Sequence, residues 1–239
     1  MPILGAVTLP SLRPHLDGNQ ARGLIEGEPI AQFELGALRN FVYLIVDWQA
    51  REAAIVDPQK DLATPLGALN QHGIQLTRIL LPHTHHDHVA GVPELARTHP
   101  LVPVMVHEMD LHRLHTSARI QTISDRETLR IGHIEVQALH TPGHSAGECC
   151  YLIAAREGHP PYLFTGDTLF IRDCGRTDQE SGSTGEMFAS LQRIKTLDHS
   201  TVILPGHHYK NECASTMARE LAESAPLQCA SVAELDALH

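Results

Sequence analysis

Six consecutive residues, His83 to His88, form the pattern H-x-H-x-D-H. Four side chains in this short segment can bind a metal, namely His83, His85, Asp87 and His88. Imidazole nitrogen and carboxylate oxygen suit a first-row cation such as zinc. In an extended backbone the side chains of His83 and His85 point to the same side, so both can reach one ion. Asp87 and His88 can then serve a neighbouring position.

Three further candidates each follow a glycine at the end of a short apolar run. They are His144 in Thr-Pro-Gly-His, Asp167 in Thr-Gly-Asp and His207 in Pro-Gly-His. Glycine permits the tight turn that aims a side chain at a shared point. Four ligands in one loop cannot complete two metal sites, and these three residues are the predicted remainder. Taken singly, each would more often be an ordinary turn residue.

The elements that must position these residues are short. The pattern predicts strands at 30–35, 41–46, 53–56, 78–81, 104–107, 128–131, 134–139, 149–154, 162–165 and 201–204, and helices at 62–72, 92–98, 109–114 and 186–197. The candidate ligands follow strand ends, where open α/β sheets present reactive groups. Both halves of the chain mix strands with helices, which predicts two sheets packed face to face with helices outside. We expect an irregular lead-in over 1–28 and one domain over 29–239 with a short C-terminal helical tail.

Composition restricts the class of partner. The 239 residues are 42% hydrophobic, enough for an ample core, and carry a formal charge of −10. This charge opposes binding to nucleic acid or to anionic lipid. The five cysteines are odd in number and show no C-x-x-C spacing, which favours a reducing cytoplasm over a disulfide framework. We see no signal peptide in residues 1–22 and no apolar run of the roughly 20 residues that a membrane span needs.

In this order, H-x-H-x-D-H, T-P-G-H, T-G-D-T and P-G-H resemble the metallo-β-lactamase superfamily over about residues 30 to 210. The resemblance implies an αβ/βα sandwich of two mixed β-sheets with flanking helices. It also implies two metal ions, most simply Zn²⁺. One would be held by His83, His85 and His144, the other by Asp87, His88 and His207, with Asp167 bridging both. We expect no ligand role for His86 or for the other histidines.

The segment that begins at Gly166 and the tail after His207 are similar to glyoxalase II-like and small acyl-thioester hydrolases. This resemblance implies hydrolysis of a thioester by a metal-bound hydroxide, with Asp87 and Asp167 as catalytic metal ligands. The substrate would be an acyl-glutathione, an acyl-coenzyme A or an acyl-carrier-protein thioester, which includes polyketide intermediates. Arg172 and Arg176 are candidates for contacting an anionic thiol carrier, and Tyr209 for lying near the carbonyl. Cys174, beside a tight glycine turn, is predicted to be structural.

Two other classes of function stay open at this point. The segment Cys174-Gly175-Arg176-Thr177-Asp178 is also similar to persulfide dioxygenases, for which the resemblance implies a single Fe²⁺ held by His83, His144 and Asp167. A non-catalytic metal-binding scaffold would have its sites closed by protein ligands. The absence of a secretory signal disfavours β-lactam hydrolysis, and the sequence does not predict an oligomeric state.

Overall fold

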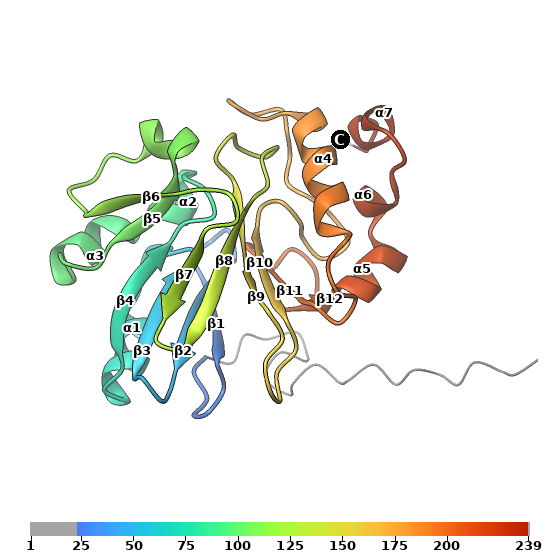
Figure 1. Cartoon of the computed structure of the whole chain (residues 1–239). Coiled ribbons are helices and arrows are strands. Elements are labelled where there is room, and N and C mark those ends of the chain that lie inside the picture. Colours follow the sequence, from blue (N-terminus) through green and yellow to red (C-terminus); the bar gives the residue numbers. More distant parts are fainter. Residues whose placement is uncertain (1–22, 239) are drawn as a thin grey trace, which may run out of the picture.

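The computed structural model describes residues 23–238 and contains two six-stranded β-sheets (Figure 1). The first sheet has the order β1-β2-β3-β4-β5-β6, with antiparallel pairs from β1 to β3 and parallel pairs from β3 to β6. Its strands are β1 (Ile30–Leu35), β2 (Asn40–Asp47), β3 (Glu52–Val56), β4 (Gln75–Leu80), β5 (Val104–His107) and β6 (Ile120–Ile123).

The second sheet has the order β12-β11-β10-β9-β8-β7 and is antiparallel except for the β10–β11 pair. Its strands are β7 (Thr128–Ile131), β8 (Ile134–His140), β9 (Cys149–Ile153), β10 (Tyr162–Gly166), β11 (Val202–Pro205) and β12 (Ser215–Thr216). Each sheet therefore mixes parallel and antiparallel pairs, as predicted.

The core lies in three layers, which the alternation along β2 illustrates. Phe41, Tyr43 and Ile45 belong to the cluster between the sheets, whereas Val42 and Leu44 belong to the cluster on the outer face of the first sheet. Because successive side chains of a strand point to opposite faces, a wholly apolar strand must be covered on both sides.

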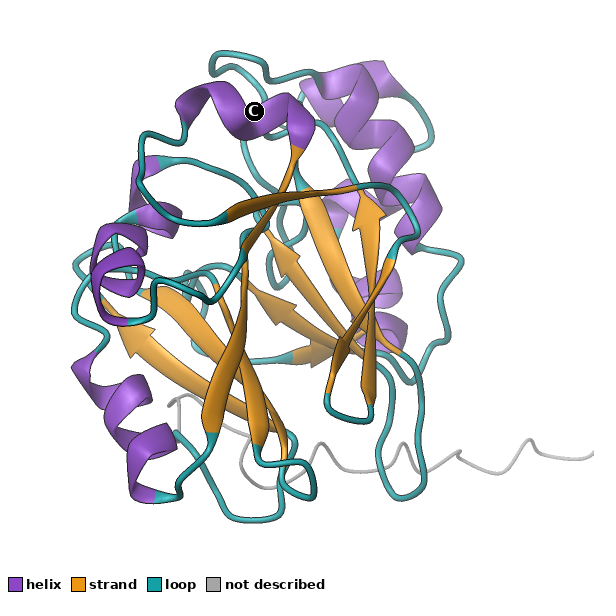
Figure 2. Cartoon of the chain, turned by 60° about the vertical axis from the view of Figure 1, so that its left-hand side comes forward, coloured by secondary structure: helices purple, strands orange, loops and turns teal. Residues whose placement is uncertain are grey.

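Helices provide that outer cover (Figure 2). The outer face of the first sheet carries α1 (Ala63–Gln71) and α3 (Val92–Thr98). That of the second sheet carries α4 (Thr184–Ile194), α5 (Met217–Glu223), α6 (Ala225–Gln228) and α7 (Val232–Asp236). The predicted sandwich of two mixed sheets with flanking helices is confirmed.

Several local predictions differ from the structure. The edge strands β6 and β12 were not predicted, because Ile-Gln-Thr-Ile is short and half polar and Ser-Thr is only two polar residues. The expected helix at 109–114 is a 3-10 helix, η1 (Glu108–Arg113), and a one-turn helix, α2 (His86–Val89), covers part of the histidine motif. Most of the expected lead-in, residues 1–22, lies outside the described residues.

Two further predictions concern cysteines and membranes. All five cysteines are free and buried. The helices within residues 23–238 are too short or too polar to span a bilayer.

Candidate metal centre

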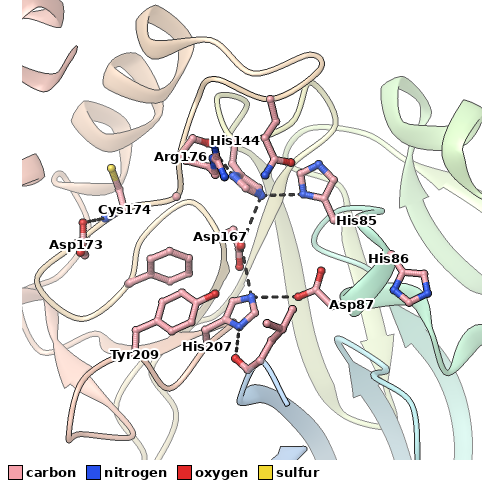
Figure 3. A pocket seen from close by; sticks show the side chains of 14 residues that line it. His85, His86, Asp87, His144, Asp167, Asp173, Cys174, Arg176, His207 and Tyr209 are labelled. Carbon is pink, nitrogen blue, oxygen red and sulfur yellow. Dashed lines mark hydrogen bonds and ion pairs between the residues drawn. The ribbon is translucent and has the colours of Figure 1, made fainter. Parts of the chain in front are cut away.

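The loops that follow four strands meet at one end of the sandwich. His83 to His88 follow β4, His144 follows β8, Asp167 directly follows β10, and His207 follows β11. The structure brings all seven predicted ligand residues together there. Figure 3 labels five of them: His85, Asp87, His144, Asp167 and His207. Their donor atoms form three sets within which all distances are below 4.8 Å: His83, His85 and His144; His83, His88 and Asp167; Asp87, His88 and His207.

Asp167 lies between the two halves of this cluster. Its Oδ1 is 3.5 Å from Nε2 of His88, and its Oδ2 is 3.5 Å from Nε2 of His144 and 3.6 Å from Nε2 of His207. Oδ2 of Asp87 lies 3.3 Å from Nε2 of both His88 and His207. Both carboxylates therefore approach the Nε2 atoms of His88 and His207, and these two nitrogens also lie close to each other.

The outer nitrogens of three imidazoles are occupied by oxygen acceptors. Nδ1 of His144 donates to the carbonyl of Arg176 at 2.8 Å, and Nδ1 of His207 donates to the carbonyl of Leu38 at 3.0 Å. Nδ1 of His88 lies 2.6 Å from Oδ1 of buried Asp57. A carbonyl oxygen only accepts, so in the neutral rings of His144 and His207 the lone pair is on Nε2, inside the cluster.

The inner nitrogens approach one another closely. Nδ1 of His85 is 2.9 Å from Nε2 of His144, and Nε2 of His88 is 3.1 Å from Nε2 of His207. Two lone pairs at this distance repel unless a cation or a proton lies between them. Two nitrogens on one tetrahedral zinc lie roughly 3.3 Å apart for bonds of about 2.0–2.1 Å, so the observed spacing fits a metal.

Two buried atoms support the same conclusion. Nε2 of His83 and Oδ1 of Asp167 have no hydrogen-bond partner within residues 23–238, although both are shielded from solvent. An orphaned buried polar atom costs about 1–3 kcal/mol, and a bound cation would remove this cost. The donor set of five imidazoles and two carboxylates therefore fits zinc or iron(II) in this place.

Electrostatics around the cluster differ from one imidazole to the next. Burial, reinforced by neighbouring His144, lowers the pKa of His85 to about 4, so this ring is neutral and can act as a ligand. Burial also lowers the pKa of His83 well below its ordinary value. For His88, burial acts in the same direction, but the charges of Asp57 and Asp167 outweigh it and raise the pKa. A proton therefore competes with a cation most strongly at His88.

Asp87 is held as a carboxylate. Burial would raise its pKa, but hydrogen bonds from His207 and His88 keep the pKa well below the ordinary range. Its Oδ2 also accepts a hydrogen bond of 2.8 Å from Nδ2 of Asn40, and Asn40 is fixed in turn by Gln59. The carboxylate is thus ionised and its orientation is fixed from behind.

Sequence reasoning missed three residues that support this cluster: Asn40, Asp57 and Glu148. Asp57 comes directly after the predicted strand 53–56 and Asn40 directly before the predicted strand 41–46, and neither belongs to a ligand motif. Glu148 is a charged residue directly before the apolar run Cys-Cys-Tyr-Leu-Ile. A charge directly before a wholly apolar strand was the available signal, because a charged residue at such a place requires a partner.

A cavity of about 610 Å³ opens beside the cluster. Its floor contains His85, Asp87, His144, Asp167 and His207, all of which face it (Figure 3). The walls are formed by Leu38, His86, Phe170, Asp173, Cys174, Gly175, Arg176, Gln179 and Tyr209. His86 lies apart from the cluster in Figure 3 and belongs to none of the three ligand sets.

The three predicted substrate contacts have different positions. Tyr209 and Arg176 line the cavity, and the Arg176 guanidinium makes two 2.6 Å hydrogen bonds to the carboxylate of Asp178. Arg172 does not line it. Its guanidinium is bonded to Glu212 and Glu223, and this turns the side chain toward the C-terminal helices.

Comparisons with known proteins show which family this chain belongs to. The model of the metallo-beta-lactamase superfamily matches residues 35–207. The chain is 34% identical over 172 residues to the "Probable polyketide biosynthesis zinc-dependent hydrolase PksB" of Bacillus subtilis, which covers 71% of this chain and 73% of that protein. It is 38% identical over 173 residues to a hydroxyacylglutathione hydrolase of Synechococcus, covering 71% of this chain and 65% of the relative.

A solved structure, ETHE1 from Myxococcus xanthus, superimposes with a TM-score of 0.76 at 27% identity and covers 86% of this chain and 87% of its own. The shared fold thus extends over most of both chains. From the family match and the identity to these relatives, we conclude that this protein belongs to the metallo-β-lactamase superfamily, as its motifs indicated.

Proposed function

We propose that this protein is a metal-dependent hydrolase that cleaves a thioester. The observation that carries the proposal is a cluster of five imidazoles and two carboxylates, of which three imidazoles and both carboxylates line the floor of an open cavity. A purely structural metal site is closed by protein ligands, whereas a catalytic site leaves room for water and substrate. The open cavity therefore favours catalysis over a metal-binding scaffold.

In this proposal His83, His85 and His144 hold one ion, Asp87, His88 and His207 hold the other, and Asp167 contacts both. Two dications bound there would acidify a shared water and polarise the substrate carbonyl. Other residues of the chain hold these candidate ligands in place. Asn40 and the backbone of Leu38 and Arg176 fix the groups that would bind the ions.

Two dications also fit the charge of the site. Four carboxylates, those of Asp57, Asp87, Glu148 and Asp167, surround the imidazoles, and none of them has an ion pair with Lys or Arg within residues 23–238. When ionised they carry four negative charges, the number that two dications neutralise. Burial raises the pKa of both Asp57 and Glu148, so this balance holds where the bound cations keep these two carboxyl groups ionised.

A thioester suits the groups around the cavity. A thiol with a pKa near ~8.5 leaves as thiolate with little protonation, so no dedicated general acid is required. Burial raises the pKa of the Tyr209 phenol to about 12. The hydroxyl therefore stays protonated at neutral pH and can donate a hydrogen bond to negative charge that develops on the carbonyl oxygen.

The thiol carrier is the finer part of the proposal. Arg176 at the cavity rim could pair with an anionic carrier such as glutathione or phosphopantetheine. The names of the two relatives support both an acyl-glutathione and an acyl thioester of a polyketide pathway. Of these, we propose an acyl-phosphopantetheine thioester, since the tail after His207 resembles small hydrolases of that kind.

One experiment tests the reaction class. The zinc-loaded protein is assayed with S-lactoylglutathione, acyl-coenzyme A, an acyl-carrier protein and a chromogenic cephalosporin, and the iron-loaded protein with glutathione persulfide while oxygen is monitored. Thiol release from a thioester with about two zinc ions per chain supports the proposal. Oxygen uptake with one iron, or turnover of the cephalosporin alone, contradicts it.

A further inference from the structure

Glu148 is buried at the junction of the loops that carry the candidate ligands. Its side chain is fully shielded from solvent, as is that of His83. The backbone around it joins the same loops, because its carbonyl accepts from the N–H of Thr141 and the next N–H, of Cys149, donates to Pro82. The residue thus lies behind the metal cluster and forms no part of the cavity wall.

The two carboxylate oxygens of Glu148 contact two different candidate ligands. Oε1 accepts a 3.0 Å hydrogen bond from the backbone N–H of Asp167. Oε2 lies 3.1 Å from Nδ1 of His83, within ion-pair distance, and neither atom has a hydrogen-bond partner within residues 23–238. One side chain therefore spans from the H-x-H-x-D-H loop to the turn that carries Asp167.

The turn before Asp167 is shaped to admit this carboxylate. Gly166 has a φ of +47°, and a Cβ atom at this position would collide with Oε1 of Glu148. Any other residue there would be strained in conformation and would displace the carboxylate. Gly166 and Glu148 therefore form one unit of close packing.

A carboxylate facing Nδ1 determines which nitrogen of His83 carries the proton. When Glu148 is ionised, it favours the tautomer of His83 with the proton on Nδ1, which leaves the lone pair on Nε2, a buried nitrogen that also lacks a hydrogen-bond partner within residues 23–238. A carboxylate behind a ligand imidazole also raises its basicity and fixes its orientation. Asp57 has the equivalent relation to His88, at 2.6 Å.

We propose that Glu148 is a positioning residue of the metal centre, which presents Nε2 of His83 to a cation and simultaneously fixes the turn of Asp167. The proposal rests on the proposed metal site but not on the identity of the substrate. Glu148 contacts both His83 and Asp167, which form one set of candidate ligands together with His88. It therefore supports both halves of the centre.

Replacement by glutamine tests the role of the charge at nearly constant shape. The amide of Glu148→Gln can satisfy only one of its two contacts. If its oxygen accepts from Asp167 N–H, its NH₂ faces Nδ1 of His83 and favours the tautomer with the proton on Nε2, which cannot bind a metal. If it is reversed, two N–H donors face each other at Asp167.

The matched control is Glu220→Gln. Glu220 is equally buried and also accepts a backbone N–H, that of Arg172 at 2.6 Å, but it belongs to no candidate ligand set. Zinc affinity of the full chain is measured by competition with a chelator, and the His83 tautomer by nitrogen NMR of the metal-free protein. Thermal unfolding of the metal-free variants reports any general loss of stability.

We expect Glu148→Gln to weaken zinc binding by about 10- to 100-fold and to shift the proton of His83 to Nε2, while Glu220→Gln does neither. Wild-type zinc affinity in Glu148→Gln overturns the inference, as does an equal loss in both variants. If the wild-type protein itself binds no zinc or iron, the proposed function fails instead, so the two failures are distinguishable.

Discussion

The ring of Tyr209 lies parallel to the imidazole of His207, with centroids 4.6 Å apart and an interplanar angle of 8°. Phe170 contacts both rings edge-on, with centroids 5.1 Å from Tyr209 and 5.8 Å from His207. This stack places a phenol at the wall of the cavity, directly beside a candidate metal ligand (Figure 3). The position of the hydroxyl is thus coupled to the geometry of the metal centre.

Replacing Tyr209 with Phe removes the hydroxyl and keeps the stack. We expect kcat for thioester hydrolysis to fall about 10-fold with little change in KM, because a donor that acts mainly in the transition state is lost. Zinc content should stay at the wild-type level, since His207 keeps its neighbour. Steady-state kinetics and metal analysis check both values, and an unchanged kcat would exclude the hydroxyl from the reaction.

Arg176 and Arg172 provide a matched pair of arginines from one loop. Arg176→Ala should raise KM for an anionic thioester by about 3- to 10-fold, as expected for loss of one exposed charge contact at the rim. Arg172→Ala should leave KM unchanged, because its guanidinium is bonded to Glu212 and Glu223 away from the cavity. Kinetics with acyl-coenzyme A measure the difference, and equal effects on KM would contradict this assignment.

Replacement of Cys174 distinguishes thioester hydrolysis from a reaction in which the cysteine sulfur takes part. Its thiol is buried, and burial raises its pKa to about 12, so it is not a thiolate at neutral pH. We therefore expect Cys174→Ser to keep kcat within about twofold of wild type, since a structural thiol is not a nucleophile. A collapse of the rate without loss of zinc would indicate that sulfur takes part in the reaction.

The ligand motifs could be identified from sequence because each is local and follows a strand end. His144, Asp167 and His207 come directly after glycine, and the loop of His83 follows a short apolar strand. The two sheets were likewise predictable. Successive side chains of a strand such as β2 point to opposite faces, and this determines which side chains enter each layer. The edge strands β6 and β12 lack that signal, because β6 is half polar and β12 consists of two polar residues.

The roles of the supporting residues could not be predicted from sequence because they come from tertiary contacts. Glu148 meets His83, and Asp57 meets His88, only after separate strands have been brought together. Arg172 shows the opposite case. Its place in the loop after Asp167 suggested a substrate contact, but its backbone has a φ of +61° and its N–H is held by Glu220 of α5, which directs the side chain outward.

Asp47 links the two sheets at hairpin turns and makes stability depend on pH. Its Oδ1 accepts from the N–H groups of Gln49 and Ala50, both at 2.9 Å, and its Oδ2 accepts from the N–H of His133 at 2.6 Å. Burial would raise the pKa of Asp47, but the hydrogen bonds from Ala50 and His133 outweigh burial and lower it. The ionised carboxylate is thus more stable in the folded chain than in the unfolded one.

Because the folded-state pKa is lowered, this stabilisation is fully present above the unfolded-state pKa of about 3.9 and is lost as the pH falls through the folded-state value. We expect Asp47→Asn to reduce the free energy of unfolding by about 1–3 kcal/mol at neutral pH. The difference from wild type should shrink below about pH 4, as urea denaturation of both proteins over a pH series would measure. A difference that is constant with pH would mean that Asp47 acts through packing.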